Sequence, residues 1–118
     1  MDLREQILGK PIPAGELVVI PAWGGAKLQL KAFTAAEFAA LRRWWREGVA
    51  AGQEPADEDV WAKTVIAGVM REDGSALFQK SDVDALKARF IAPINQLFNA
   101  IAELNGITAD AAERIRGN

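Results

Sequence analysis

The sequence predicts a mainly α fold with a small N-terminal β-hairpin, an α+β arrangement in which the hairpin packs on a bundle of about four helices. Two observations predict it. Residues 16–33 contain a β-branched run, a glycine pair and an alternating run, whereas residues 34–107 carry apolar stripes at helical spacing. The length of 118 residues is that of one domain. Its expected parts are a helix and lead-in (1–15), the hairpin (16–33), a helical core (34–107) and a short C-terminal helix or tail (108–118).

The first third of the chain is expected to hold a short helix and two strands. The helix covers Leu3–Gly9, with its apolar residues on one side, and a proline-containing break follows it. The strands are Glu16–Ile20, a continuous apolar run, and Lys27–Phe33, in which apolar and polar residues alternate. Leu28 and Leu30 therefore share one face. An isolated hairpin is marginal in water, so this face must lie on helices.

The turn between these strands contains a glycine pair and a tryptophan. Gly24-Gly25 supplies the positive φ values that a tight hairpin turn requires. Trp23 precedes the pair, where its side chain is either a lid on the core or a contact for a partner. The general tendency of tryptophan to be largely buried favours the core.

A capped helix follows the hairpin. Thr34 and Glu37 have the spacing of a capping box, in which each side chain accepts a hydrogen bond from the other residue's backbone N–H. The apolar stripe of this helix ends at Trp45. Trp44 lies about 100° around the helix from Trp45, so both cannot point into the centre of one small core. One of the two is therefore expected at an edge or an interface.

A second helix is predicted to begin at Asp57–Asp59, where three acids complement the helix dipole. Its buried stripe runs from Val60 to Val69 at helical spacing. Gly68 lies in that stripe, which indicates the close approach of another element. Asp73-Gly74 then marks a turn. Whether the apolar pair Leu77-Phe78 pairs as a strand stays open.

A third helix is predicted with Ser81 as its N-cap. Pro93 interrupts it, so we expect a kink or break near Ile91-Ala92, with Pro93 in the first turn of a new helix. Asn105-Gly106 ends that helix, and Thr108–Arg116 is predicted as a last short helix. The apolar stripe of the third helix and its continuation is expected to be Leu86, Phe90, Ile94, Leu97, Phe98, Ile101 and Leu104.

Composition excludes several kinds of chemistry. The chain has no cysteine and no histidine, so it has no disulfide, no thiolate or imidazole metal site, and no triad with an imidazole base. We expect no enzyme activity and no cofactor. The formal net charge of -2 weakens a nucleic-acid function. No apolar stretch is long enough to span a bilayer and no signal peptide is visible, so the cytoplasm is the expected compartment.

The most function-like run is Arg42-Arg43-Trp44-Trp45-Arg46. Arginine and tryptophan are enriched at interface hot spots, so the run is a candidate protein-binding surface, with Trp61 and Trp23 as further candidates. The same residue types also stack on bases and pair with phosphates in single-stranded nucleic acid. The third alternative is a helix with no binding role in this run, whose inner face holds Trp45 and whose outer face is simply charged.

The order of these motifs resembles that of the tail assembly chaperones of long-tailed bacteriophages and prophages. The resemblance covers nearly the whole chain, and it lies in the succession of short motifs more than in any one of them. The matching parts are Leu3–Leu8, Val18–Gly24, Thr34–Phe38, Asp73-Gly74 with Leu77-Phe78, and Leu97–Ile107. The paired Trp44-Trp45 departs from the family pattern.

The resemblance implies a non-enzymatic protein of mostly helical fold. It implies binding to the tape measure protein and recruitment of tail tube subunits during tail assembly, self-association in some members, and a longer form made by translational frameshift. A small nucleic-acid-associated regulator using Arg42–Arg46 and a structural head–tail or tail component of the virion are the alternative hypotheses.

Overall fold

The predicted hairpin is present in the computed structural model, which describes residues 2–107. It consists of β1 (Ala14–Ile20) and β2 (Ala26–Lys31), paired antiparallel with Val18 opposite Leu28. A single 3-10 turn, η1 (Pro21–Trp23), connects β1 to the glycine pair. Gly24 and Gly25 have φ values of 68° and 76°, which confirms the predicted need for glycine at the turn.

A third strand, which the sequence analysis did not predict, completes the sheet. β3 (Val69–Met70) pairs antiparallel with β2, and the strand order is β1-β2-β3. Val69 had been assigned to the stripe of the second helix, but that helix ends at Gly68 and the chain continues directly as a strand. The apolar pair Leu77-Phe78 is not a strand. Both side chains are half-buried and pack against the core.

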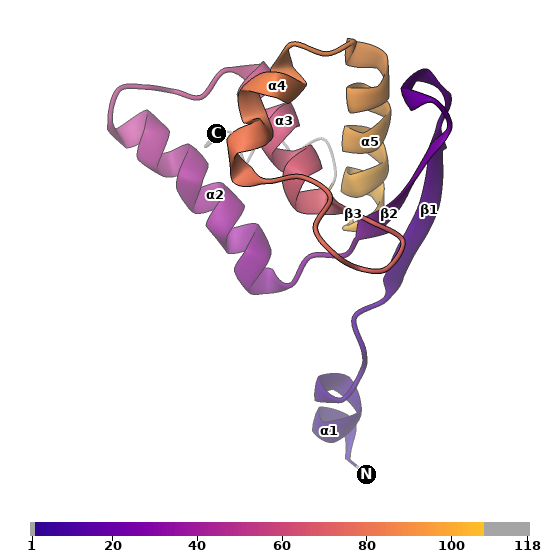
Figure 1. Cartoon of the computed structure of the whole chain (residues 1–118). Coiled ribbons are helices and arrows are strands. Elements are labelled where there is room, and N and C mark those ends of the chain that lie inside the picture. Colours follow the sequence, from indigo (N-terminus) through magenta and orange to yellow (C-terminus); the bar gives the residue numbers. More distant parts are fainter. Residues whose placement is uncertain (1, 108–118) are drawn as a thin grey trace.

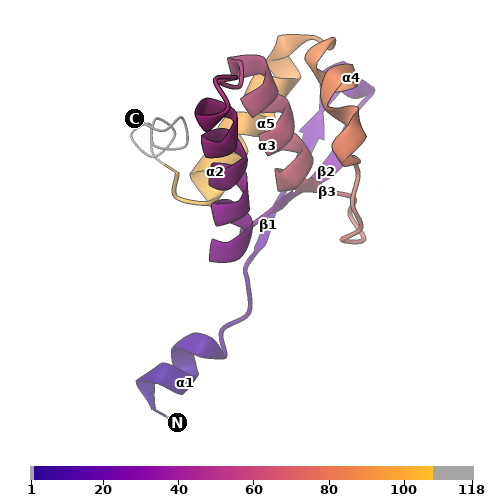
Figure 2. The same cartoon turned by 90° about the vertical axis from the view of Figure 1, so that its left-hand side faces the viewer.

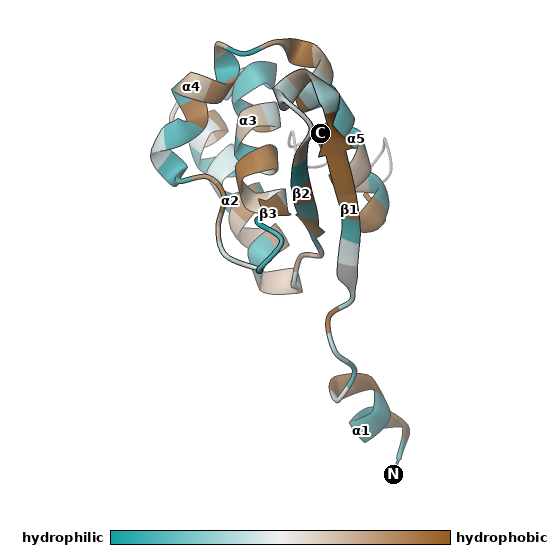
Figure 3. Ribbon diagram, turned by 45° about the vertical axis from the view of Figure 1, so that its right-hand side comes forward, coloured by the Kyte–Doolittle hydropathy of each residue, from teal (hydrophilic) through white to brown (hydrophobic). Residues whose placement is uncertain are grey.

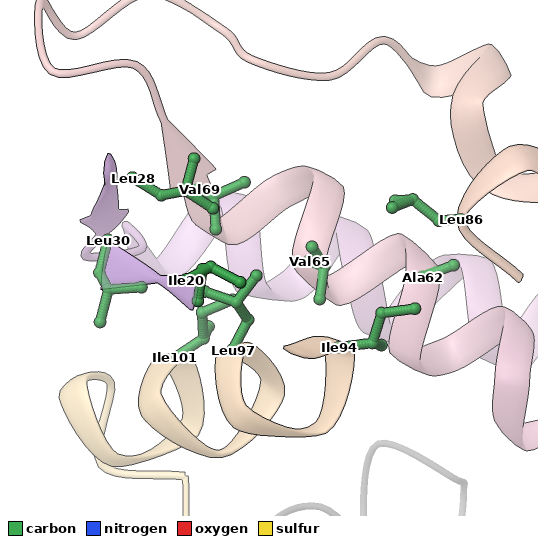
Figure 4. Close-up of a cluster of buried hydrophobic side chains, with 10 residues drawn as sticks. All are labelled: Ile20, Leu28, Leu30, Ala62, Val65, Val69, Leu86, Ile94, Leu97 and Ile101. Atoms are coloured by element: carbon green, nitrogen blue, oxygen red, sulfur yellow. The ribbon is translucent and has the colours of Figure 1, made fainter. Parts of the chain in front are cut away.

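Two helices cover one face of this sheet. They are α3 (Asp57–Gly68) and α5 (Ile91–Leu104), and both pack on β2. The short α4 (Val83–Lys87) packs on α3. Figure 4 shows the core between these layers, to which the three strands and the helices α3, α4 and α5 contribute side chains. The mainly α class with an N-terminal hairpin is thus confirmed. The core residues are Ile20, Leu28, Leu30, Ala62, Val65, Val69, Leu86, Ile94, Leu97 and Ile101.

The two remaining helices lie outside this layered core. α2 (Ala35–Ala50) lies across α3 on the side away from α5, and it begins with the predicted capping box. The Thr34 N–H donates to Glu37 Oε1 at 2.9 Å, and the Glu37 N–H donates to Thr34 Oγ1 at 3.1 Å. The N-terminal helix α1 (Leu3–Leu8) stands apart from the rest of the fold at the end of an extended segment in both views (Figures 1 and 2).

The third predicted helix is divided, and two details of its prediction were wrong. Ser81 is not an N-cap, because it lies inside a 3-10 turn, η2 (Lys80–Asp82), that precedes α4. Phe90 is not part of the buried stripe, since 68% of its surface is exposed. It is the residue before α5, and the break falls there because the ring of Pro93 would clash with the carbonyl of Arg89, four residues earlier, in a continuous helix. Pro93 lies in the first turn of α5, as predicted.

The end of α5 is tied to the end of β2. Asn105 is the C-cap, and Gly106 follows with a φ of 65°, as the sequence predicted. The Asn105 side chain accepts a hydrogen bond from the Phe33 N–H at 2.7 Å and donates to the Ile101 carbonyl at 2.9 Å. These bonds hold the start of the connection to α2 against the helix that supports the sheet. The predicted helix at Thr108–Arg116 lies outside the described residues.

At Gly68, α3 lies close to Ile101 of α5, as the place of this glycine in the stripe predicted. A Cβ atom added there would lie 2.6 Å from Cδ1 and 2.8 Å from Cγ1 of Ile101. We expect Gly68→Ala to lower the free energy of unfolding by about 1–2 kcal/mol, because overpacking outweighs the gain of roughly 1 kcal/mol in helix propensity. Chemical denaturation measures the change.

Two further variants separate these contributions. Ala67→Gly, at the exposed neighbouring position, measures the propensity term alone. Adding Ile101→Val to Gly68→Ala removes the nearest atom, so the double variant should lose less stability than the sum of the two single changes. Additive losses would show that the Gly68–Ile101 contact is not the cause.

Candidate functional site

A groove of about 550 Å³ lies between α2, α3 and the segment that follows β3. Its apolar lining includes Leu41 and Trp44 from α2 and Ile66 from α3. Met70 of β3 and Phe78 of the segment after it also line the groove. We call this the α2–α3 groove. Its volume lies within the range of roughly 300–1,000 Å³ that is usual for ligand sites in proteins.

Three lysines surround the groove. Lys31 forms an ion pair with Glu37, the acid of the capping box. The ammonium nitrogen of Lys63 lies 4.8 Å from the centroid of the Trp44 ring, where it is attracted by the ring's negative face. Lys80, in the 3-10 turn before α4, also lines the groove. Within residues 2–107 neither Lys63 nor Lys80 has a carboxylate partner within 4.0 Å, so the rim is positively charged.

The structure separates the two candidate tryptophans of α2. Trp45 is 1% exposed, so in this conformation its side chain is unavailable to a partner. Trp44 is half-buried and lines the groove, and its ring lies at 69° to that of Trp45, with 6.4 Å between the centroids. The prediction that only one of the pair points inward is therefore confirmed.

The other two candidate tryptophans lie elsewhere. Trp61 of α3 is half-buried against the core and borders a separate hollow of about 110 Å³ beside α4 and α5. Trp23 also packs against the core, which agrees with the lid alternative for that residue. Neither Trp61 nor Trp23 lines the α2–α3 groove.

The candidate arginines lie together on a different face of α2. Arg42, Arg43 and Arg46 surround a hollow of about 190 Å³ together with Ala39. The run that alternates arginine with tryptophan in the sequence is thus divided in space, because successive helix residues point in different directions. The arginine cluster has no aromatic side chain in its lining.

Sequence reasoning missed most residues of the groove. Lys31, Ile66 and Met70 belong to three separate elements, and nothing in the spacing of the sequence links them. Phe78 was noted only as part of an apolar step. The position of Phe78 shortly after the polar turn at Asp73-Gly74 could have indicated its role, since a large apolar side chain there is expected to pack against another element.

The ion pair at the groove edge predicts a pH dependence. The hydrogen bond from Lys31, and next the hydrogen bond with the backbone N–H of Thr34, lower the pKa of Glu37 from its ordinary value of 4.5. Because the folded-state pKa is lowered, the stabilisation is present above pH 4.5 and is lost as the pH falls through the folded-state pKa. Both side chains are more than a third exposed, so we expect under about 1 kcal/mol.

The variant Glu37→Gln tests this dependence. It keeps a side chain that accepts from Thr34 but removes the charge. Its deficit in unfolding free energy relative to the parent should be present at pH 7 and should shrink in urea titrations toward pH 3. A deficit that is the same at both pH values would show that the charge of Glu37 contributes nothing.

The described residues contain no group of three or more carboxylates placed to hold a metal ion. In the same part of the chain, none of the helices has the length and apolar character needed to cross a membrane. The features that remain are an apolar groove with a basic rim and an arginine cluster. They lie on a domain of α+β architecture, with a three-stranded sheet supported by two helices and a third helix beside the groove.

Comparison with known proteins identifies this architecture. No family model and no curated protein matches the chain. Among solved structures, the fold matches that of the bacteriophage HK97 tail assembly chaperone, with a TM-score of 0.58 and 14% sequence identity. The match covers 87% of this chain and 98% of the chaperone chain. The chain therefore has the fold of a phage tail assembly chaperone, as its motif order predicted.

Proposed function

We propose that the protein is a non-enzymatic chaperone of phage tail assembly that binds the tape measure protein, and with it tail tube subunits, in the cytoplasm of the bacterial host. The observation that carries this proposal is the fold match, which extends over almost the whole of both chains.

The α2–α3 groove is the part of the molecule that we assign to this task. An amphipathic helix binds by laying its apolar face into such a groove, with charged residues at the rim. Trp44 supplies a large apolar contact surface at the groove edge, and tryptophan is enriched among interface hot spots. Lys63 and Lys80 favour helical segments that carry acids beside their apolar face.

Co-expression tests the proposal. The chain is produced together with the long helical protein encoded beside it in a tail gene cluster, and separately with the tail tube subunit. We expect the tape measure protein to become soluble and to co-purify with the chaperone. The variant Ala40→Glu places a charge in the groove and should weaken co-purification. Its matched control is Ala39→Glu on the arginine face of the same helix, which should leave co-purification unchanged. A tape measure protein that stays insoluble and unbound would refute the proposal.

The arginine cluster favours a second candidate, a small regulator that binds nucleic acid through Arg42, Arg43 and Arg46. Three guanidinium groups around one hollow are suited to phosphate oxygens. A gel shift with single-stranded oligonucleotides that weakens steeply with salt would support this function. No shift at low salt would eliminate it. Detection of the protein in purified particles would instead support a structural role in the virion.

A further inference from the structure

The outer edge of β1 is open in the part of the chain that the structure describes. β1 is the terminal strand in the order β1-β2-β3, so among residues 2–107 no strand lies on its side away from β2. Figure 3 shows β1 at the margin of the sheet, with its apolar residues in brown. The opposite edge is short and partly closed, because β3 has two residues and Met70 forms a bridge with Ala76.

The second half of β1 lacks the features that usually protect an edge strand. Natural sheets blunt their edges with lysines, prolines or bulges. The register shifts between Ala14 and Leu17, but Leu17–Ile20 pairs regularly with β2. This stretch contains no proline and no charged residue. Alternate residues of an edge strand direct their N–H and C=O groups away from the neighbouring strand, so β1 offers backbone donors and acceptors to a further strand.

The side chains of this edge also suit a further strand. Leu17 and Val19 are 43% and 48% exposed, whereas Ile20 is 1% exposed and Val18 packs against the core. Because successive side chains of a strand point to opposite faces, Leu17 and Val19 lie on the face of the sheet away from α3 and α5. A strand beside β1 would cover both of them with its own alternate side chains.

We infer that the free edge of β1 is a strand-addition site, which receives an extended segment of a different protein with alternating apolar residues and a lysine or arginine. In this mode main-chain hydrogen bonds supply the affinity and alternate side chains supply the specificity. The inference goes beyond the proposed function and does not depend on it, since no residue of β1 lines the α2–α3 groove.

Charge favours a different protein over a second copy of β1. Glu16, at the start of the regular stretch, is exposed and has no lysine or arginine nitrogen within 4.0 Å in residues 2–107. An opposite charge on the added strand would stabilise the pairing. β1 itself contains no lysine and no arginine, so a second β1 cannot supply that charge.

The chain's own N-terminal segment is also a poor occupant of this edge. It contains Pro11 and Pro13, which have no N–H to donate to a neighbouring strand. Both views place α1 at the far end of this segment, away from the sheet (Figures 1 and 2).

The first test is an NMR titration of the full chain, labelled with nitrogen-15, with the peptide acetyl-Val-Lys-Val-Thr-Val-Thr-amide. We expect saturable shifts of the β1 amide signals and slower amide exchange along β1, while the indole signal of Trp44 in the groove stays in place. The same peptide methylated on two consecutive backbone nitrogens lacks donors on both of its edges there. It should bind at least about tenfold more weakly.

The second test exchanges the charges. A peptide with glutamate in place of its lysine should bind the parent chain roughly two- to fivefold more weakly, and Glu16→Lys should reverse this preference. Val19→Asn removes apolar contact surface at the edge and should weaken binding of both peptides by a similar factor. The matched control is Lys27→Gln, an exposed position on β2, one strand away from the edge. The dispersion of the amide signals checks that each variant is folded.

Three results would overturn the inference. They are unshifted β1 amides at millimolar peptide, equal binding of the methylated peptide, and a preference between the two peptides that Glu16→Lys leaves unchanged. Sedimentation velocity without peptide provides a further check. Copies that associate through β1, dissociate on Val19→Asn and bind no peptide would assign the edge to a second copy, which also contradicts the inference.

These outcomes are separable from the proposed function. Ala40→Glu in the groove should leave peptide binding unchanged. A tape measure protein that fails to bind would leave the peptide result in place, and failure of the peptide to bind would leave the groove and its proposed partner untouched.

Discussion

The variant Trp45→Ala is expected to lower the free energy of unfolding by about 3–5 kcal/mol, the range observed when a fully buried aromatic side chain is removed from a core. Trp45 is 1% exposed and is one of the largest fully buried side chains of the molecule. Its removal leaves a cavity beneath α2 that the surrounding helix cannot close without moving. Urea titration followed by far-UV circular dichroism measures the loss.

The variant Trp45→Phe is the control for packing. The indole N–H of Trp45 is buried and has no hydrogen-bond partner among the described residues. A buried donor without a partner costs about 1–3 kcal/mol, so replacing the indole with a phenyl ring removes that cost while it removes some packing. We therefore expect a much smaller loss than for alanine. Equal losses in the two variants would show that removal of the indole N–H relieves no such cost.

The variant Trp44→Ala is expected to weaken association at the α2–α3 groove by roughly 30-fold, which corresponds to about 2 kcal/mol, the threshold for an interface hot spot. Trp44 is the aromatic side chain of α2 that lines the groove and carries Lys63 over its ring. Co-purification measures the effect on binding of the tape measure protein, the partner proposed for this groove.

Replacement of Trp45 should mainly lower the free energy of unfolding, whereas replacement of Trp44 should mainly weaken binding. Trp44 is half-buried, so its replacement should cost only about 1–2 kcal/mol, from the lost ring–ring and ring–lysine contacts. The matched control is Arg43→Ala, an exposed position on the same helix that does not line the groove. Association that is unchanged by Trp44→Ala and weakened by Arg43→Ala would place the interface on the arginine face instead.

Most of the local structure followed from local signals. The capping box at Thr34, the glycine pair at Gly24-Gly25 and the restart of the helix at Pro93 each act within a few residues of themselves. Caps, turns and proline breaks depend on residues that are close in the sequence, so they can be predicted from it. The errors fell where a tertiary contact competes with a local preference.

Phe90 and Val69 show that competition. Phe90 continues the apolar spacing of the third helix, but the break imposed by Pro93 rotates the following helix and leaves Phe90 in solvent. Val69 continues the spacing of α3, but it pairs with Leu30 and becomes the first residue of a strand. Its side chain is buried in either case, so the hydrophobic pattern does not distinguish the two conformations.

Local sequence signals were enough to predict the mainly helical class, the hairpin, the capping box at Thr34, the close approach at Gly68 and the resemblance carried by the motif order. The burial of Trp45 agrees with the apolar stripe of its helix, but the separation of Trp44 from the arginines that flank it became visible only in the folded chain. Folding also assembled the groove, because Lys31, Ile66 and Phe78 meet only after the chain has folded back on itself. A groove consists of the surfaces of several elements, and their relative placement depends on packing between residues far apart in the chain.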